Sequence, residues 1–99
     1  MQDFQTKMVR SGKAERLFTH LKCKDGFTMS VQGSEHNYSC PRRDVEATQY
    51  SEMEIGFPSQ EEPLILEYAE QPEIPTGTVY GYVPVDLIQK VIDKHGGLA

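Results

Sequence analysis

Hydrophobic and polar residues alternate strictly over residues 27–32, which predicts a strand with one buried face. The hydrophobic positions of this run are Phe27, Met29 and Val31. The dipeptide Asp25-Gly26 precedes the run and is a strong signal for a β-hairpin turn. Segment 15–24 could form a strand or a short helix by itself. The hairpin signal favours a strand there, paired with residues 27–32.

Three further segments have the composition of strands. Alternating hydrophobic residues predict a strand that begins at Tyr50 and ends at Gly56 or Pro58, and the run 78–83 is rich in β-forming residues. Residues 64–69 could form a short buried strand. Gly81 interrupts the run 78–83, where it marks a β-bulge or a close approach of the backbone. The polar segment 33–46 predicts a loop.

The clearest element is an amphipathic helix over residues 84–95. Its hydrophobic residues recur at helical spacing and form one stripe: Val85, Leu87, Ile88, Val91 and Ile92. Pro84 suits the first helical position, and Gly96 suits the left-handed position that ends a helix. These elements together predict an α+β fold, in which an antiparallel sheet of four to five short strands carries the C-terminal amphipathic helix on one face.

Length and hydropathy limit the class of protein. A chain of 99 residues is long enough for one domain. We expect a flexible N-terminal segment over 1–12, followed by a single α+β domain over 13–99. No apolar run approaches the roughly 18 residues that a membrane span requires. Basic residues such as Lys7 and Arg10 interrupt the region where a secretory signal would be hydrophobic. We therefore expect a cytoplasmic protein that does not contact a membrane.

Charge is distributed unevenly along this chain, whose formal net charge is -5. Residues 1–43 hold eight basic and four acidic side chains, whereas residues 44–89 hold ten acidic and no basic ones. Such an acidic stretch repels nucleic acid, so we expect no direct nucleic-acid binding. The stretch is either a solvated surface or a docking face for a basic partner. The candidate docking face consists of Glu52, Glu54, Glu61, Glu62, Glu67, Glu70 and Glu73.

Two histidines and both cysteines have the spacing of a zinc finger, with gaps of two, twelve and three residues. These four residues are His20, Cys23, His36 and Cys40. Their surroundings argue against a metal site, because the first pair falls in a predicted strand, where positions three apart face opposite sides. A buried, reduced Cys23 with Cys40 in a loop is the simpler interpretation, and a disulfide between them is the alternative. We therefore expect no metal and no cofactor.

Arginine and tyrosine residues form a candidate ligand-binding site. Arginine binds phosphates through paired hydrogen bonds, and tyrosine rings stack on bases. The only double arginine of the chain lies in the predicted loop, close to a tyrosine. The candidate set, which could hold a small nucleotide, consists of Tyr38, Arg42, Arg43, Tyr80 and Tyr82. Alternatively, the tyrosines are half-buried strand residues and the arginines pair with the acidic stretch.

Several short sequences resemble a family of small proteins encoded by bacteriophages and prophages. The resemblance covers about residues 17–98 and rests on residues 23–32, 40–42, 54–59, 68–70, 79–85 and 94–97. It implies a phage product that acts in the bacterial cytoplasm. The family has no assigned activity, so the resemblance assigns no role to any residue.

Three classes of function remain. The first is a non-enzymatic phage accessory protein that binds and inhibits or sequesters a host factor of anti-phage defence, either a host protein or a small nucleotide signal. The second is a phage structural or morphogenesis component. The third is a small metal-binding or hydrolytic domain, which would use residues such as His36 and Cys40. A homo-oligomer is plausible in each class, because a second copy often covers edge strands and apolar helix flanks.

Overall fold

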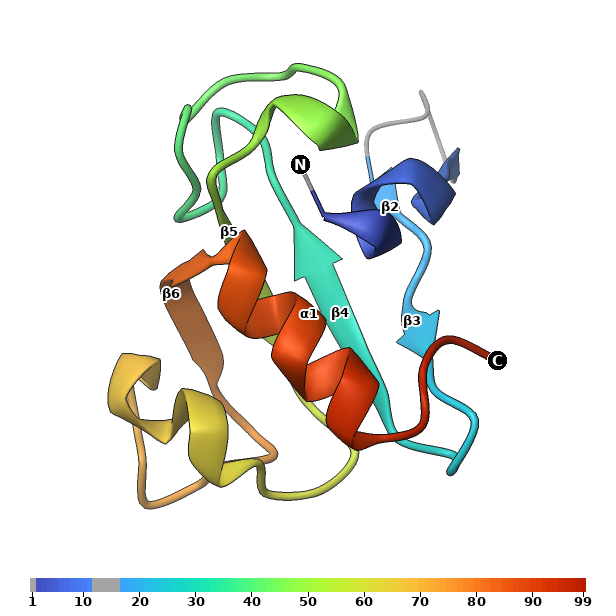
Figure 1. The fold of residues 1–99 in the computed structure, drawn as a ribbon. Helices are drawn as coiled ribbons and strands as arrows, with labels where there is room; N and C mark the ends of the chain where they lie inside the picture. Colours follow the sequence, from blue (N-terminus) through green and yellow to red (C-terminus); the bar gives the residue numbers. More distant parts are fainter. Residues whose placement is uncertain (1, 12–16) are drawn as a thin grey trace.

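The computed structural model describes residues 2–11 and 17–99, and its main elements form two layers (Figure 1). One layer is an antiparallel four-stranded sheet in the order β3-β4-β5-β6, and helix α1 packs on one face of it. The fold predicted from the sequence is therefore confirmed. The elements are β3 (Leu21–Lys22), β4 (Thr28–Gln32), β5 (Glu52–Gly56), β6 (Val79–Pro84) and α1 (Val85–Lys94).

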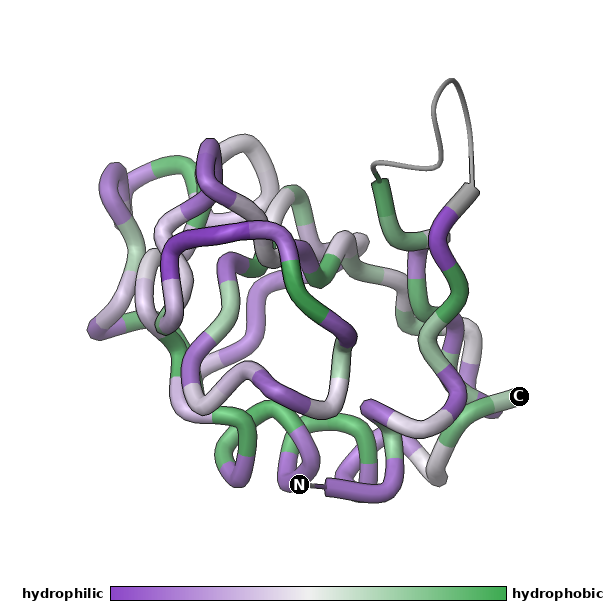
Figure 2. The backbone as a smooth tube through the Cα atoms, turned by 90° about the horizontal axis from the view of Figure 1, so that it is seen from above, coloured by the Kyte–Doolittle hydropathy of each residue, from purple (hydrophilic) through white to green (hydrophobic). Residues whose placement is uncertain are grey.

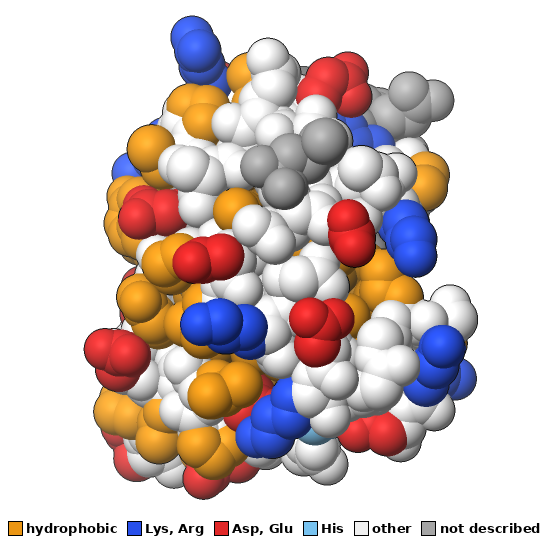
Figure 3. Space-filling model, viewed as in Figure 1, with side chains coloured by type: hydrophobic (Ala, Val, Ile, Leu, Met, Phe, Trp, Pro, Cys, Tyr) orange, Lys and Arg blue, Asp and Glu red, His pale blue; other side chains and the backbone are white. Residues whose placement is uncertain are grey.

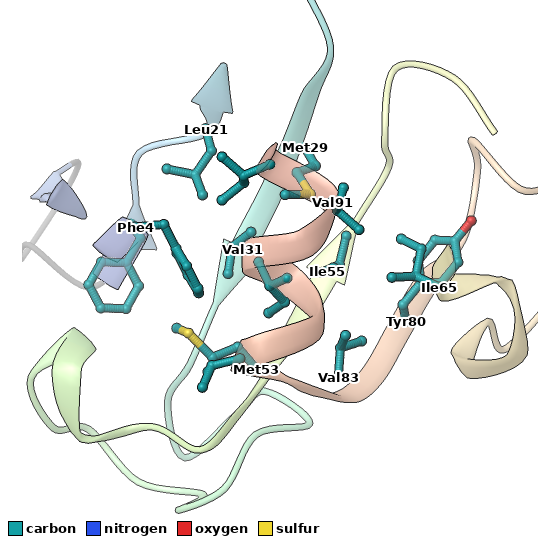
Figure 4. Packing of buried hydrophobic residues seen from close by; sticks show 14 of the residues in the cluster. Phe4, Leu21, Met29, Val31, Met53, Ile55, Ile65, Tyr80, Val83 and Val91 are labelled. Carbon is teal, nitrogen blue, oxygen red and sulfur yellow. The ribbon is translucent and has the colours of Figure 1, made fainter. Parts of the chain in front are cut away.

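The core lies between α1 and the sheet, and alternation along the strands determines which residues enter it. Met53 and Ile55 of β5 are fully buried, whereas Glu52 and Glu54, which alternate with them, point to the opposite face and are half-buried. In the predicted strand 27–32, the hydrophobic positions are buried in the same way. The fully or nearly fully buried residues of α1 are Val85, Ile88, Val91 and Ile92. Figure 4 shows the helix and strand side chains meeting in one cluster.

Helix α1 begins directly after β6 and ends close to the predicted boundary. The sequence predicts Pro84 as the first helical residue. In the structure Pro84 is the N-cap, and the helix begins one residue later, at Val85. His95 is the C-cap residue, and its N–H donates to carbonyl oxygens of the last turn. Gly96 follows with a φ of 91°, the left-handed conformation that was expected at this position.

Strand β6 contains the irregularity that Gly81 predicts. Met53 pairs with Val83 while Ile55 pairs with Tyr80, so β6 has one more residue than β5 over this stretch. A Cβ atom on Gly81 would lie 3.2 Å from the Cβ atom of Tyr38. Both parts of the expectation are therefore confirmed: the strand bulges here, and the loop before β5 approaches it closely.

The predicted buried strand over 64–69 is wrong, because this segment forms the 3-10 helix η4 (Pro63–Tyr68). A proline in the first turn and a side-chain cap both favour a helical start, and the Glu62 carboxylate accepts the Leu64 N–H at 3.0 Å. The burial expected of a strand is partly retained, since Ile65 is fully buried beside β6. Figure 4 shows Ile65 next to Tyr80.

Within the segment 1–12, for which flexibility is expected, the described residues 2–11 include a short helix and contacts with the core. Residues Asp3–Lys7 form the 3-10 helix η1, and the Phe4 ring is buried in the core. The Gln5 side chain is buried as well, and its amide donates to the carbonyl oxygens of Ala47 and Tyr50 at 2.8 and 2.9 Å. The sequence gives little sign of this packing because only one aromatic residue in a polar segment carries it.

The expected strand over 15–24 is divided into two short strands where the structure describes it. The first, β2 (Leu17–Phe18), pairs with β1 (Arg10–Ser11) in a separate two-stranded sheet, whereas β3 pairs with β4 as predicted. The Gln32 side chain joins β2 to β4, because its amide accepts the Phe18 N–H and donates to the Phe18 carbonyl, both at 2.8 Å. Residues 12–16 lie outside the described residues.

Both outer edges of the four-stranded sheet are covered by short segments of the same chain. Leu98 forms an antiparallel bridge with Cys23 beside β3, and Ala69 forms one with Tyr80 on the far side of β6. These bridges pair part of each edge within the chain, which leaves less of either edge open to a second copy. A homo-oligomer remains a prediction.

Hydrophobic and hydrophilic residues alternate along the backbone instead of forming long uniform runs (Figure 2). This follows from a small core that takes one face of each element and leaves the other to water. Within residues 2–11 and 17–99, no helix has both the length and the apolar character needed to cross a membrane.

The loop between β4 and β5, residues 33–51, is held in place by the buried ring of Tyr50. The Tyr50 hydroxyl donates to the Arg43 carbonyl at 2.7 Å and accepts the Val45 N–H at 3.3 Å. The short helix η3 (Ala47–Gln49) precedes Tyr50. Gly33 lies against the ring, and a Cβ atom at this position would be only 2.6 Å from it.

We predict that Gly33→Ala destabilises the protein by about 1–3 kcal/mol, the usual cost of forcing an extra carbon into a packed site. The measurement is the free energy of unfolding in urea. Gly77→Ala is the matched control, because a Cβ atom there meets its nearest neighbour at an ordinary 3.7 Å. Equal stabilities of the two variants would contradict the steric role of Gly33.

Candidate functional site

Loop 33–51 and strand β6 together present two tyrosines and an arginine at the surface. The rings of Tyr38 and Tyr82 have centroids 5.8 Å apart and are tilted by 36°. The Arg42 guanidinium lies over the Tyr38 ring, 5.3 Å from its centroid. This cation–π contact orients the planar guanidinium and leaves its N–H donors at the surface. We call Tyr38, Arg42 and Tyr82 the tyrosine–arginine cluster.

Backbone hydrogen bonds fix Tyr38 from two sides. Its N–H donates to a carboxylate oxygen of Glu54 at 2.9 Å, and its carbonyl accepts the Tyr82 N–H at 2.9 Å. The other oxygen of Glu54 accepts the Asn37 side-chain amide at 3.3 Å. The absence of a side chain at Gly81 allows Tyr38 to come this close to β6. The cluster is therefore built on a strand and on an immobilised loop.

Tyr82 has a backbone conformation that is unfavourable for its residue type. Its φ is 53°, in the left-handed region, where a residue with a Cβ atom costs about 1–2 kcal/mol. Its side chain is nevertheless 43% exposed. Local strain that holds an aromatic ring at the surface is more typical of a binding site than of a stabilising contact.

Two of the five predicted ligand-binding residues do not join the cluster. Tyr80 is fully buried in the core, and its hydroxyl donates to the Pro75 carbonyl. The bulge puts Tyr80 and Tyr82 on opposite faces of β6, although residues two apart in a regular strand share a face. The side chain of Arg43 is exposed, and the contact that fixes this residue is made by its carbonyl oxygen, which binds Tyr50.

The predicted acidic face is divided by the fold. Glu62 is buried, and Glu54 is used to hold Tyr38, while Glu52 is half-buried on β5. The remaining four are exposed in η4 and in the segments before and after it: Glu61, Glu67, Glu70 and Glu73. On the side of the molecule that carries α1, acidic side chains are interspersed with basic and hydrophobic ones (Figure 3).

The four residues with zinc-finger spacing do not form a metal site. Across the described parts of the chain, no group of three or more His, Cys, Asp or Glu side chains is arranged to hold a metal ion. Cys23 is buried and Cys40 is exposed, and both thiols are free, as the simpler interpretation predicted. His36 lies at the surface beside Glu35, and His20 is exposed.

A second cluster, which the sequence analysis did not identify, surrounds His95. Its Nδ1 atom lies 2.6 Å from Asp25 Oδ2, and its Nε2 atom lies 2.7 Å from Glu62 Oε1. The Lys94 ammonium donates to the second oxygen of Glu62 at 2.9 Å. The Phe27 ring is stacked on the imidazole, with centroids 4.1 Å apart. We call Asp25, Glu62, Lys94 and His95 the histidine clamp.

The clamp shifts the pKa of each of its three central groups. Burial alone would lower the pKa of His95, but hydrogen bonds and charges from both carboxylates outweigh it and raise that pKa. Burial alone would raise the pKa of Glu62, but the Leu64 N–H, Lys94 and His95 together lower it. The pKa of Asp25 is lowered, first by the Phe27 N–H and then by His95.

These contacts assign the clamp a structural role in the folded chain. Both ring nitrogens of His95 face carboxylates, so neither is free to take a proton from a substrate. The sequence placed Asp25 in a turn and His95 at the end of a helix. The two residues are 70 positions apart, and no local signal connects them.

Comparison of the chain with protein-family models, with curated proteins and with solved structures finds no match.

The clamp predicts a loss of stability on raising the pH. A raised pKa of His95 in the folded state stabilises the protein fully below the ordinary histidine value of about 6.5, and this contribution is lost as the pH rises through the folded pKa. The lowered pKa values of Asp25 and Glu62 act in the opposite sense, and their contribution is lost as the pH falls through them.

The measurement is the free energy of unfolding in urea between pH 5.5 and about 8. The upper limit is chosen because burial raises the pKa of the Cys23 thiol, whose ionisation in the unfolded chain adds a separate loss above its ordinary value of about 8.5. We expect stability to fall across this range in the wild type and in His36→Gln, and to stay nearly level in His95→Gln. A parallel fall in all three would show that another group is responsible.

Proposed function

We propose that this chain is a non-enzymatic accessory protein of a bacteriophage, and that it binds a bacterial host protein through the tyrosine–arginine cluster. The observation that carries the proposal is the exposed ring of Tyr82, held in a strained conformation next to Tyr38, whose own ring lies under the Arg42 guanidinium. Pre-oriented side chains lose little conformational freedom on binding, which favours affinity.

The construction of loop 33–51 supports a role in binding. Loops longer than about 12–15 residues with little regular structure are uncommon in small domains and are usually functional. This loop is anchored at several points, including Tyr38 on Glu54 and Tyr50 on the Arg43 carbonyl. Ordering a loop in this way costs conformational entropy. The feature that the ordered loop presents at the surface is the tyrosine–arginine cluster, which is therefore the candidate for its function.

The residue types of the cluster favour a protein as the partner. Tyrosine and arginine are among the residues that contribute most to binding free energy at protein interfaces. A nucleotide is less favoured for two reasons. Tyr80 lies in the core, so only two of the expected tyrosine rings can contact a ligand. In addition, the net charge of -5 opposes the approach of a phosphate.

The phage setting of this proposal comes from the sequence resemblance described above. A host protein is the partner that fits a small phage product whose described histidines are not arranged as a catalytic base. His95 has both ring nitrogens engaged, His36 is paired with Glu35, and His20 is exposed at the surface. A catalytic base would need a free nitrogen within reach of a nucleophile.

The first test compares single variants in a capture experiment from a bacterial lysate, followed by calorimetry with the purified partner. We expect Arg42→Ala and Tyr82→Ser each to weaken binding by about 2 kcal/mol or more, which is roughly 30-fold, as interface anchors do. Arg43→Ala is the control for charge. Phe57→Ser is the control for an exposed aromatic ring with a positive φ, since Phe57 is 58% exposed with a φ of 49°.

A captured protein that binds the Arg42→Ala, Tyr82→Ser double variant as tightly as the wild type would overturn the proposal. Native mass spectrometry of the purified chain gives the second check. A retained nucleotide that is lost in the same double variant would replace the protein partner by a small-molecule ligand.

A separate prediction uses the strain at Tyr82. Tyr82→Gly removes a left-handed residue that costs about 1–2 kcal/mol, and it also removes a ring contact worth about 0.5–1.5 kcal/mol. These effects nearly cancel, so we expect the free energy of unfolding to change by less than about 1 kcal/mol while partner binding is lost. Urea unfolding and calorimetry measure the two quantities. A large loss of stability would mean that the ring serves the fold instead.

A further inference from the structure

The last residues of the described chain lie along the free side of strand β3. After α1, the backbone reverses at Gly96 and Gly97, which have φ values of 91° and 89°. The following residues run antiparallel to β3, where Leu98 bridges to Cys23. We call residues 96–99 the strap.

Few interactions hold the strap on the sheet. The Lys24 N–H donates to the Gly97 carbonyl, and the Ala99 N–H donates to the Lys22 carbonyl, each at 2.9 Å. Next to them, the Asp25 N–H donates to the His95 carbonyl at a longer 3.3 Å. Gly96 and Gly97 are also ordered by α1, because their N–H groups donate to the carbonyls of Asp93 and Ile92 at 3.1 and 2.9 Å. On the sheet itself, two hydrogen bonds and the half-buried Leu98 are little against the entropy of ordering the end of the strap.

The histidine clamp lies directly at the start of the strap and adds the missing stabilisation. Asp25 belongs to the turn that follows β3, and His95 immediately precedes the strap. Their side chains therefore join the same two segments that the strap hydrogen bonds join. Glu62 holds the opposite side of the imidazole and is itself only 1% exposed.

We propose that the clamp and the strap form one proton-controlled device, in which loss of a proton from His95 releases residues 96–99 from the edge of β3. The reason is the number of N–H donors on the imidazole ring. Carboxylates only accept hydrogen bonds, so contact with both Asp25 and Glu62 requires an N–H on each ring nitrogen. A neutral imidazole has one N–H and can serve only one of the two carboxylates.

The burial of the two carboxylates decides which contact is lost. The Glu62 side chain is 1% exposed, so breaking its contact would leave a buried carboxylate with fewer partners. The Asp25 side chain is 47% exposed and can be solvated by water. The single N–H of neutral His95 therefore remains with Glu62, and the contact to Asp25 opens. This is the contact that ties the strap to the turn after β3.

The charges around the imidazole are balanced only when His95 is protonated. The groups that face it are Asp25 from the turn, Glu62 from the segment before η4 and the uncharged ring of Phe27, which stacks on it. Lys94 of α1 neutralises Glu62, with its ammonium 2.9 Å from the second carboxylate oxygen. Loss of the proton thus leaves one negative charge uncompensated.

A cysteine next to the strap can be used to detect its release. Cys23 has a free thiol that is 1% exposed, and Leu98 lies opposite it in the antiparallel bridge, on the same face of the sheet. Departure of the strap uncovers this thiol. The exposed Cys40 would react first, so Cys40→Ser is used as the background.

The experiment measures the alkylation rate of Cys23 by iodoacetamide at pH 6 and pH 8. Each rate is divided by that of the urea-unfolded chain at the same pH, which removes the effect of thiol ionisation. We expect this protection of Cys23 to fall between pH 6 and pH 8, because the pKa of His95 is raised in the closed state and loss of its proton therefore favours opening. In His95→Gln, protection should be low at both pH values.

His36→Gln is the matched control, because it removes an exposed histidine and should behave as the wild type does. Asp25→Asn provides a second clamp variant if His95→Gln fails to fold, and its protection should also be low at pH 6. The urea dependence of alkylation distinguishes local from global opening. Release of four residues exposes little surface, so the rate should hardly depend on urea below the unfolding transition.

Two results would overturn the proposal. One is a protection of Cys23 that does not change between pH 6 and pH 8 in the wild type. The other is an alkylation rate that rises with urea as steeply as global unfolding does, which would mean that the thiol reacts only in the unfolded chain.

Discussion

His95 connects three segments that the chain order keeps far apart. Its imidazole binds Asp25, 70 positions away, and Glu62, 33 positions away, while its own backbone ends α1. Removal of one member of a buried ion pair typically costs about 3–5 kcal/mol, a large part of the stability of a small domain. The positions of the hairpin turn, of η4 and of the last residues thus depend on this one contact.

Buried polar side chains also join distant segments in the loops, where regular structure is sparse. The side chains of Gln5 and Gln32 are buried and bind backbone groups of distant segments, as a strand or helix would otherwise do. Tyr50 does the same within loop 33–51. In the described parts of the chain, no buried side-chain nitrogen or oxygen lacks a hydrogen-bond partner. A chain with a small core is therefore held together by polar contacts as well as by burial.

The order imposed on loop 33–51 connects the fold with the proposed function. A flexible loop would present Arg42 in many orientations, and the loss of conformational entropy on fixing one of them would weaken binding. Here the stack of Arg42 on Tyr38 and the hydrogen bond from Tyr38 to Glu54 make that selection in the free protein. The strained backbone of Tyr82 is tolerated because the bulge and the surrounding core hold it in place.

The amino-acid sequence by itself determined the elements whose signals are local. Three such signals depend on residues only a few positions apart: the Asp25-Gly26 turn, the alternation along β4 and β5, and the apolar stripe of α1. The structure has each of these elements where it was predicted. In the candidate site, Tyr38, Arg42 and Tyr82 were identified by residue type alone.

Only the tertiary structure decided which of these residues meet. The bulge in β6 separated the buried Tyr80 from the exposed Tyr82, and a 3-10 helix capped by Glu62 replaced the expected strand at 64–69. The histidine clamp and the packing of Phe4 could not be predicted from the sequence either. A hydrogen bond between side chains many positions apart leaves no periodic trace in the chain, because its geometry exists only once the sheet and helix have brought the two ends together.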